Sequence, residues 1–246
     1  LLIAPVLGFG QGEQRYADGT ATDQDGNTFE WINYGTQDWA IEDAKVVTYR
    51  DGTAIPKVEG QKGNYQSGYY EWTNSINGRW CYQMNDESKG KLYNWYAVMG
   101  IHDNDETTPN KEFAPYGWRV PTDADWTELE NYLIANGYNY DGSLEENKIA
   151  KSMASTLKWT TNQNQGGIGN DLSQNNKSGF NVFPNGFRQT GGAFNYSESM
   201  YWITLFWTST KNDSNKIWNR ILSTNYNYLY KNIAHGEKSG LSVRFV

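Results

Sequence analysis

The stretch that decides the fold is residues 121–137, PTDADWTELENYLIANG. Thr122 is followed three residues later by Asp125, the spacing of a reciprocal helix N-cap in which each side chain bonds the other residue's backbone N–H. From Trp126 onward, apolar residues recur at three- and four-residue spacing and form one stripe. The closing Asn-Gly pair is a typical helix stop. The stretch therefore predicts a capped helix with its stripe in the core.

Two further helices are predicted near this one. The second begins at Ser143, with Glu146 in the reciprocal cap position and an apolar stripe through Ile149, Met153 and Leu157. Residues 90–98 favour a third, short helix.

The remaining elements are predicted strands and loops. Residues 28–32 alternate apolar and polar side chains, and residues 38–41 are their expected hairpin partner. Residues 160–178 are rich in Asn, Gln and Gly, which indicates a long solvated loop. Later β-like runs follow at residues 180–183, 202–208, 217–222, 226–230 and 241–246. The fold class is therefore α+β, with two to three helices on an antiparallel, partly irregular sheet.

Composition limits the classes of function. The 246 residues include 11 Trp, 18 Tyr and 9 Phe, enough aromatic area to build a core despite only 37% hydrophobic residues. The net charge of −7 and the scattered Lys and Arg residues argue against a nucleic-acid partner, which needs a basic surface to neutralise phosphates. The single cysteine, Cys81, excludes an intramolecular disulfide and is expected to be a small buried residue in a strand at 80–82.

The N-terminal segment differs from the rest of the chain. Residues 1–11 are apolar and end in small residues, as in the later part of a secretory signal, and they are too few to span a bilayer. A buried strand or an anchor in a larger assembly are the alternatives. We expect residues 1–21 to be this segment with its lead-in, and residues 22–246 to be a single domain. The expected location is secreted or on the cell surface.

Several segments together resemble the Fibrobacter succinogenes major paralogous domain of secreted bacterial proteins. They occur in the expected order and cover most of residues 22–246: residues 23–27 (DQDGN), 35–39 (GTQDW), 51–56 (DGTAIP), 90–98 (GKLYNWYAV), 115–126 (PYGWRVPTDADW), 178–188 (SGFNVFPNGFR), 206–210 (FWTST) and 239–246 (SGLSVRFV). The resemblance implies a C-type-lectin-like fold related to the formylglycine-generating-enzyme branch.

The chain departs from the family pattern in three places. The usual Met-Ala-Glu-Asn-Leu is here residues 40–44, AIEDA, and two positions that usually hold cysteines are here Ala114 and Phe245. Loss of both cysteines is consistent with a missing disulfide, so core packing must hold the fold. The oxidase activity of the related branch needs paired cysteines, which a single cysteine does not provide.

The sequence contains few residues in catalytic or metal-binding patterns. His102 and His235 are far apart and accompany no nucleophile motif, and we expect no enzymatic activity. The loop residues Asp103, Asp105 and Glu106 are a weak calcium candidate, since carboxylates suit this hard cation, although a solvated turn is the favoured interpretation. No other cofactor is expected. Carboxylates Glu42, Asp43, Glu71 and Asp86 would matter to a carbohydrate-active enzyme only if the fold brought them together.

The C-terminal region is the predicted ligand-binding surface. Its strands interleave apolar residues with Tyr, Asn and Ser, the residue types that supply rigid contact area and adaptable hydrogen bonds in binding surfaces. The candidate contact residues are Tyr201, Asn212, Asp213, Ser214, Asn215, Asn219, Ile221, Ser223, Asn225, Asn227, Tyr230 and Asn232. This residue set also resembles the variable positions of proteins diversified by retroelements.

The leading hypothesis is a non-catalytic adhesion or ligand-binding domain that recognises a protein or glycan on another cell. The first alternative is a structural or receptor-binding component of a virion or surface appendage. A carbohydrate-active enzyme ranks last, because no carboxylate pair is identified by spacing.

Overall fold

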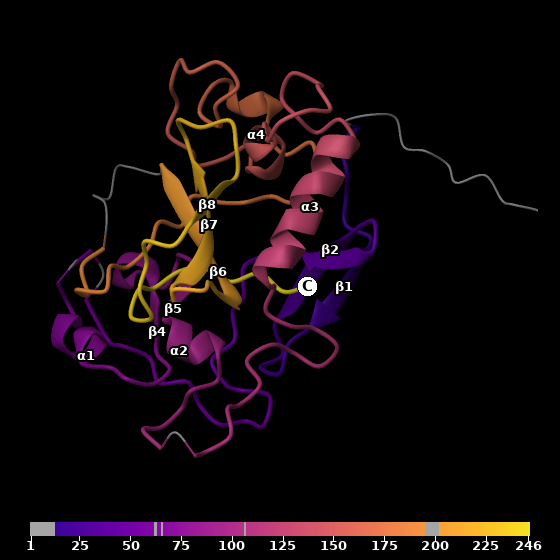
Figure 1. The fold of residues 1–246 in the computed structure, drawn as a ribbon. Coiled ribbons are helices and arrows are strands. Elements are labelled where there is room, and N and C mark those ends of the chain that lie inside the picture. The colour runs from indigo at the N-terminus through magenta and orange to yellow at the C-terminus, as the bar shows by residue number, and fades with distance from the viewer. Residues whose placement is uncertain (1–12, 62, 65, 106, 195–201) are drawn as a thin grey trace, which may run out of the picture.

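The computed structural model describes residues 13–61, 63, 64, 66–105, 107–194 and 202–246. Within them the fold is α+β with antiparallel sheets, as predicted (Figure 1). One sheet has the order β1-β2-β3, a two-stranded sheet pairs β4 with β5, and a third has the order β6-β7-β8. The strands are β1 Gly19–Thr22, β2 Thr28–Tyr34, β3 Gln37–Ala40, β4 Trp80–Tyr82, β5 Lys91–Tyr93, β6 Ile203–Lys211, β7 Ile217–Ser223 and β8 Tyr230–Asn232.

The helices are few and mostly short. They are α1 Tyr69–Thr73, α2 Trp95–Val98, α3 Asp123–Ala135 and α4 Ala150–Met153, with 3-10 turns at Gln83–Asn85 and Leu172–Gln174. None of the helices in the described ranges combines the length and the apolar character that crossing a bilayer requires.

The predicted capped helix is α3, and its cap is confirmed. The Thr122 hydroxyl accepts a hydrogen bond from the Asp125 N–H (3.1 Å), and the Asp125 carboxylate accepts one from the Thr122 N–H (2.6 Å). The stripe begins with fully buried Trp126, whose ring lies 4.7 Å from Trp39 and 5.4 Å from Phe206. The helix therefore packs between the β1–β3 and β6–β8 sheets (Figure 1).

The C-terminal tail, residues 240–246, connects the three sheets. Leu241 exchanges backbone hydrogen bonds with Tyr93 of β5, and Ser242 bonds to the backbone of β6. Further along, the Val243 carbonyl accepts from Ala44 and the Phe245 carbonyl accepts from Ala40 of β3. The predicted last strand is thus a set of isolated bridges to different partners rather than a member of one sheet.

The prediction of a second helix beginning at Ser143 is wrong for most of the segment. Only Ala150–Met153 are helical, and Leu157 is exposed. The Asn139 amide donates to the carbonyls of Ser143, Glu145 and Glu146, and its oxygen accepts from the Lys148 N–H. These bonds satisfy the backbone groups that a first helical turn would use, because Asn side chains compete with helix hydrogen bonding.

Other predicted elements are confirmed in part. The hairpin of β2 and β3 is present, with Ile32 opposite Trp39. The third helix is limited to α2, because residues 91–93 form β5. Residues 180–183 form no named strand but only a bridge between Ala154 and Val182. Residues 160–178 are not fully solvated, since Ile168 is buried in the core.

Strand pairing begins earlier than the predicted domain start. β1 pairs with β2 from Gly19 onward, so residues 19–21 belong to the folded domain rather than to the lead-in. Residues 1–11, the predicted signal or anchor, lie outside the described residues. Cys81 lies in β4 and is fully buried, as predicted, and burial raises the pKa of its thiol.

Replacing Asp125 with Asn tests the cap. Burial alone would raise the pKa of Asp125, but hydrogen bonds from Arg119 and Thr122 outweigh burial and the pKa is lowered. A lowered folded-state pKa adds stability above the unfolded value near 4 that is lost as pH falls. We expect Asp125→Asn to reduce the free energy of unfolding by about 1–3 kcal/mol at pH 7.

The measurement is urea unfolding at pH 7 and pH 3. The difference between the two pH values should be smaller in Asp125→Asn than in the wild type. Glu145→Gln, on an exposed side chain, is the control. An unchanged pH dependence in Asp125→Asn would contradict the assignment.

Candidate functional site

Three predicted contact residues are buried, and their prediction as ligand contacts is wrong. Asn219 has 0%, Ile221 7% and Ser223 3% of its surface exposed. All three lie on β7, the central strand of its sheet. Successive side chains of a strand point to opposite faces of the sheet, so a row of them reaches solvent only where one face of the sheet is uncovered. β7 is covered on both faces.

The two faces of β7 pack against different hydrophobic core clusters. Ile217 and Ile221 belong to the cluster that contains Trp207 and Trp95, whereas Leu222 belongs to the cluster around Trp126 of α3. No row of β7 side chains therefore reaches solvent as a recognition surface.

The other predicted residues are wholly or partly accessible. Asp213, Ser214 and Asn215 are exposed in the turn between β6 and β7, where the Asn212 side-chain oxygen accepts from the N–H groups of Ser214 and Lys216. Along residues 225–232, Asn225 and Tyr230 are exposed and Asn227 and Asn232 are half-buried. Tyr201 lies outside the described residues.

The most prominent feature of this surface is a row of three tyrosines, Tyr226, Tyr228 and Tyr230, called here the tyrosine row. Tyr226 and Tyr228 are stacked with ring centroids 5.0 Å apart, and Tyr228 meets Tyr230 edge-to-face at 6.0 Å. Tyr226 and Tyr230 are 46% and 44% exposed. Partial burial, and then the two neighbouring tyrosines, raise the pKa of Tyr228.

Sequence reasoning selected Tyr230 but missed Tyr226 and Tyr228. The signal was present, because residues 226, 228 and 230 are spaced by two and therefore share one side of an extended segment. Asn225 and Asn227, which are among the predicted contact residues, alternate with these tyrosines in the sequence.

The backbone of the tyrosine row is anchored by neighbouring loops. Asn147 donates to the Leu229 carbonyl (2.9 Å) and accepts from the Leu229 N–H (3.0 Å). Asn162 donates to the Thr224 carbonyl at 2.7 Å, and the Ile168 N–H donates to the Tyr226 carbonyl at 3.3 Å. The rings are therefore presented from a backbone that is bonded at both ends and in the middle.

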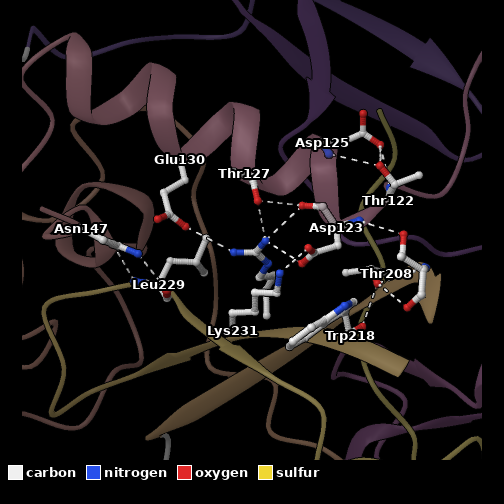
Figure 2. A network of polar contacts seen from close by, with 12 residues as sticks. Thr122, Asp123, Asp125, Thr127, Glu130, Asn147, Thr208, Trp218, Leu229 and Lys231 are labelled. Atoms are coloured by element: carbon white, nitrogen blue, oxygen red, sulfur yellow. Dashed lines mark hydrogen bonds and ion pairs between the residues drawn. The ribbon is translucent and has the colours of Figure 1, made fainter. Parts of the chain in front are cut away.

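A charged network between the β6–β8 sheet and α3 joins the two (Figure 2). The buried Arg220 donates to the Asp123 carboxylate (2.7 Å), the Thr127 hydroxyl (3.0 Å) and Glu130 (3.3 Å). Lys231 of β8 reaches the same Asp123 carboxylate at 2.5 Å and lies 3.9 Å from the Trp218 ring centroid. Burial raises the pKa of Glu130, and Arg220 opposes this rise.

The weak calcium candidate remains a prediction. The Asp103 carboxylate accepts the Asp105 N–H, and Asp105 accepts the N–H and hydroxyl of Thr107, which lowers the pKa of Asp105. Glu106 lies outside the described residues. In the part of the chain that is described, no three His, Cys, Asp or Glu side chains gather in a way that could hold a metal ion.

Three of the four carboxylates considered for an enzyme have partners within the protein, and Glu71 is exposed on α1. Glu42 pairs with Lys45, Asp43 pairs with Arg244, and Asp86 accepts from Ser88 within its own turn. His235 packs its ring 4.9 Å from Phe187, and burial lowers its pKa.

Comparison with known sequences assigns the family. The sequence model of the Fibrobacter succinogenes major domain matches residues 32–246. The chain belongs to this family. The matched part begins in β2 and contains α3, the β6–β8 sheet and the tail, so the tyrosine row and the charged network lie inside the family domain. Searches of curated proteins and of solved structures gave no match.

Ala114 and Phe245, the two positions at which the resemblance implies cysteines, lie in one core cluster. Both are buried, and the Phe245 ring lies 6.1 Å from that of Phe113. Apolar side chains therefore pack at both positions.

Replacing Asn147 with Ala tests the anchoring of the tyrosine row. The change removes both hydrogen bonds to Leu229 and should lower the free energy of unfolding by about 1–3 kcal/mol, with faster hydrogen exchange at Leu229. Asn131→Ala, on an exposed position of α3, is the matched control. Unchanged exchange at Leu229 in Asn147→Ala would show that the anchor is elsewhere.

Replacing Asn219 with Leu tests the buried amide of β7. Neither polar atom of this side chain has a hydrogen-bond partner in the described residues. Because Leu is apolar and similar in size, we expect the free energy of unfolding to rise by about 1 kcal/mol. Asn225→Leu, on the exposed surface, should stay within about 0.5 kcal/mol of wild type. A destabilised Asn219→Leu would indicate that a buried water satisfies the amide.

Proposed function

We propose that this protein is a non-catalytic recognition domain with a C-type-lectin-like fold, displayed outside the cell, whose tyrosine row contacts a partner on another surface. The observation that carries this proposal is the row of three neighbouring phenol rings on an anchored backbone, with Tyr226 and Tyr230 exposed and Tyr228 half-buried between them. Tyrosines give large, rigid contact area at low conformational entropy cost, which is why binding surfaces favour them.

The surroundings of the row supply the polar contacts of such an interface. Asn225 is exposed beside it, and Asn164 reaches it from the neighbouring loop at residues 160–178, with its amide donating to the Asn225 carbonyl at 3.4 Å. An aromatic centre with a rim of amide donors and acceptors is the usual composition of a specific contact surface.

The partner that best suits this surface is a protein. The stacked Tyr226 and Tyr228 rings each turn one face toward the other, so these two faces are not available to a sugar ring. The two pockets of about 500 and 610 Å³ lie elsewhere and are not lined by the row. Small ligands are usually bound in such concave pockets, whereas protein partners are bound on flatter surfaces.

The triple variant Tyr226→Ala, Tyr228→Ala, Tyr230→Ala tests the proposal. The wild-type domain is screened against arrayed surface proteins, arrayed glycans and intact cells, and the variant is measured against each target found. We expect at least a tenfold loss of affinity, about 1.4 kcal/mol, because central aromatic residues dominate such interfaces.

The matched control removes tyrosines of comparable or greater exposure elsewhere: Tyr16→Ala, Tyr70→Ala, Tyr116→Ala. Circular dichroism checks that both triple variants fold. A protein target lost only in the row variant supports the proposal, and a glycan target lost in the same way changes the class of partner. Equal binding by the row variant and wild type contradicts it.

Diversification by a retroelement is proposed to act on the accessible positions alone. These are the turn at residues 212–215 and the segment at residues 225–232, since Asn219, Ile221 and Ser223 are buried and do not reach a partner. An adenine-rich template repeat beside a reverse transcriptase gene would support this origin, and its absence from the locus would remove it.

A further inference from the structure

A concave site lies away from the tyrosine row. It is a pocket of about 500 Å³ between the segment after β3, the β4–β5 connection and residues 181–185, with Arg244 of the tail in its lining. A volume of this size falls in the range of small-molecule sites, about 300–1,000 Å³.

The base of this pocket is a fixed ion pair. Arg244 donates to the Asp43 carboxylate at 2.6 Å and to the carbonyls of Ala40, Phe180 and Asn181, so these bonds use four of its five N–H groups. The other Asp43 oxygen accepts from the Asn185 amide at 2.5 Å. Asp43 is therefore neutralised by its own partners and does not repel an incoming anion.

The walls carry an excess of positive charge in a protein that is acidic overall. Five basic and three acidic side chains line the pocket: Lys45, Lys89, Lys91, Lys158, Arg244, Glu42, Asp43 and Glu87. Glu42 is paired with Lys45, and Glu87 with Lys57. Within the described ranges, neither Lys91 nor Lys158 has a carboxylate in ion-pair distance; each ammonium instead lies against aromatic rings.

These two lysines combine charge with flat apolar walls. The Lys91 ammonium lies 5.2 Å from the Trp80 ring centroid and 5.5 Å from that of Tyr82, and the Lys158 ammonium lies 5.5 Å from Phe183. Tyr82 and Phe183 themselves line the pocket. An ammonium above a ring remains available to an anion, because the ring does not neutralise its charge.

An unsatisfied donor in the wall points independently to a ligand. Gln83 lines the pocket and is 1% exposed, yet its amide nitrogen has no acceptor in the described part of the chain. A buried donor without a partner is costly, so natural structures rarely keep one unless a ligand, water or ion completes it.

We propose that this pocket binds an anionic sugar of one or two rings, with its acid group on Lys91 and Lys158 and its ring against Tyr82 and Phe183. Sugar rings present both C–H surface and hydroxyl groups, which matches aromatic walls beside the amides of Gln83 and Asn185. The acid group meets separate ammonium charges rather than an arginine fork, because the Arg244 guanidinium is held by Asp43 and backbone carbonyls. The site does not depend on the tyrosine row.

Calorimetric titration of the full chain with glucuronate, glucose 6-sulfate, glucose 6-phosphate and glucose tests this site. We expect at least one of the anionic sugars to bind at least about tenfold more tightly than glucose, with affinity falling as salt is raised. The tightest of the three identifies the acid group. Binding of none of them, or equal binding of glucose, overturns the proposal.

Lys158→Gln and Lys91→Gln locate the binding. Lys158 is exposed, so its replacement should not disturb folding, and each variant should weaken binding of the anionic sugar by about tenfold. Lys216→Gln, on an exposed lysine in the β6–β7 turn, is the matched control. Unchanged affinity in both pocket variants overturns the assignment. Retained affinity in the triple tyrosine variant separates this site from the proposed recognition surface.

Discussion

The ion pair between Arg244 and Asp43 is the interaction on which the arrangement of the sheets depends. It lies in the middle of the tail that bonds in turn to β5, β6 and β3. The Arg244 guanidinium also donates to the carbonyls of Ala40 and Phe180, which are far apart in the sequence. If the tail moved, all three sheets would lose backbone partners at once.

Two other buried arginines have the same role at other joints of the fold. Arg220 joins β7 to the first turns of α3 through Asp123 and Glu130. Arg188 donates to the carbonyls of Ser67 and Gly192 and stacks 4.7 Å from the Trp72 ring. Buried charge pairs add little net stability compared with apolar packing, but breaking one leaves a charge uncompensated at a cost of about 3–5 kcal/mol. Arg220 and Arg244 make such pairs with carboxylates, and Arg188 is held by backbone carbonyls.

The sequence predicts best the features whose partners are close in the chain. The α3 cap is formed between Thr122 and Asp125, so its spacing alone predicts it. The second helix carries a similar cap signal, but Asn139, just before it, bonds the same backbone groups and leaves only Ala150–Met153 helical. That competition depends on the conformation of the Asn139 loop, which the periodicity of residues 143–157 does not encode.

The prediction of the binding surface has the same limit, because it depends on contacts between residues that are distant in the sequence. Alternation along β7 predicts one exposed row, yet strands far from it in sequence cover one face and α3 covers the other. β8, by contrast, is an edge strand that pairs only with β7 in the described sheet, and Tyr230 there is exposed. Accessibility therefore follows from the position of a strand in its sheet, and sheet order is set by long-range pairing that composition does not reveal.

Because of where the pocket lies, a ligand bound in it would change the stability of the whole fold. Its base is the Arg244–Asp43 pair, so a ligand held there contacts the joint that secures the tail. A ligand that binds only the folded state stabilises it by RT ln(1 + [L]/Kd), about 2.7 kcal/mol at a hundred times Kd. The tail also bonds to β6, so the same segment supports both the pocket and the sheet that presents the tyrosine row. The two sites share this structural support but have no residue in common.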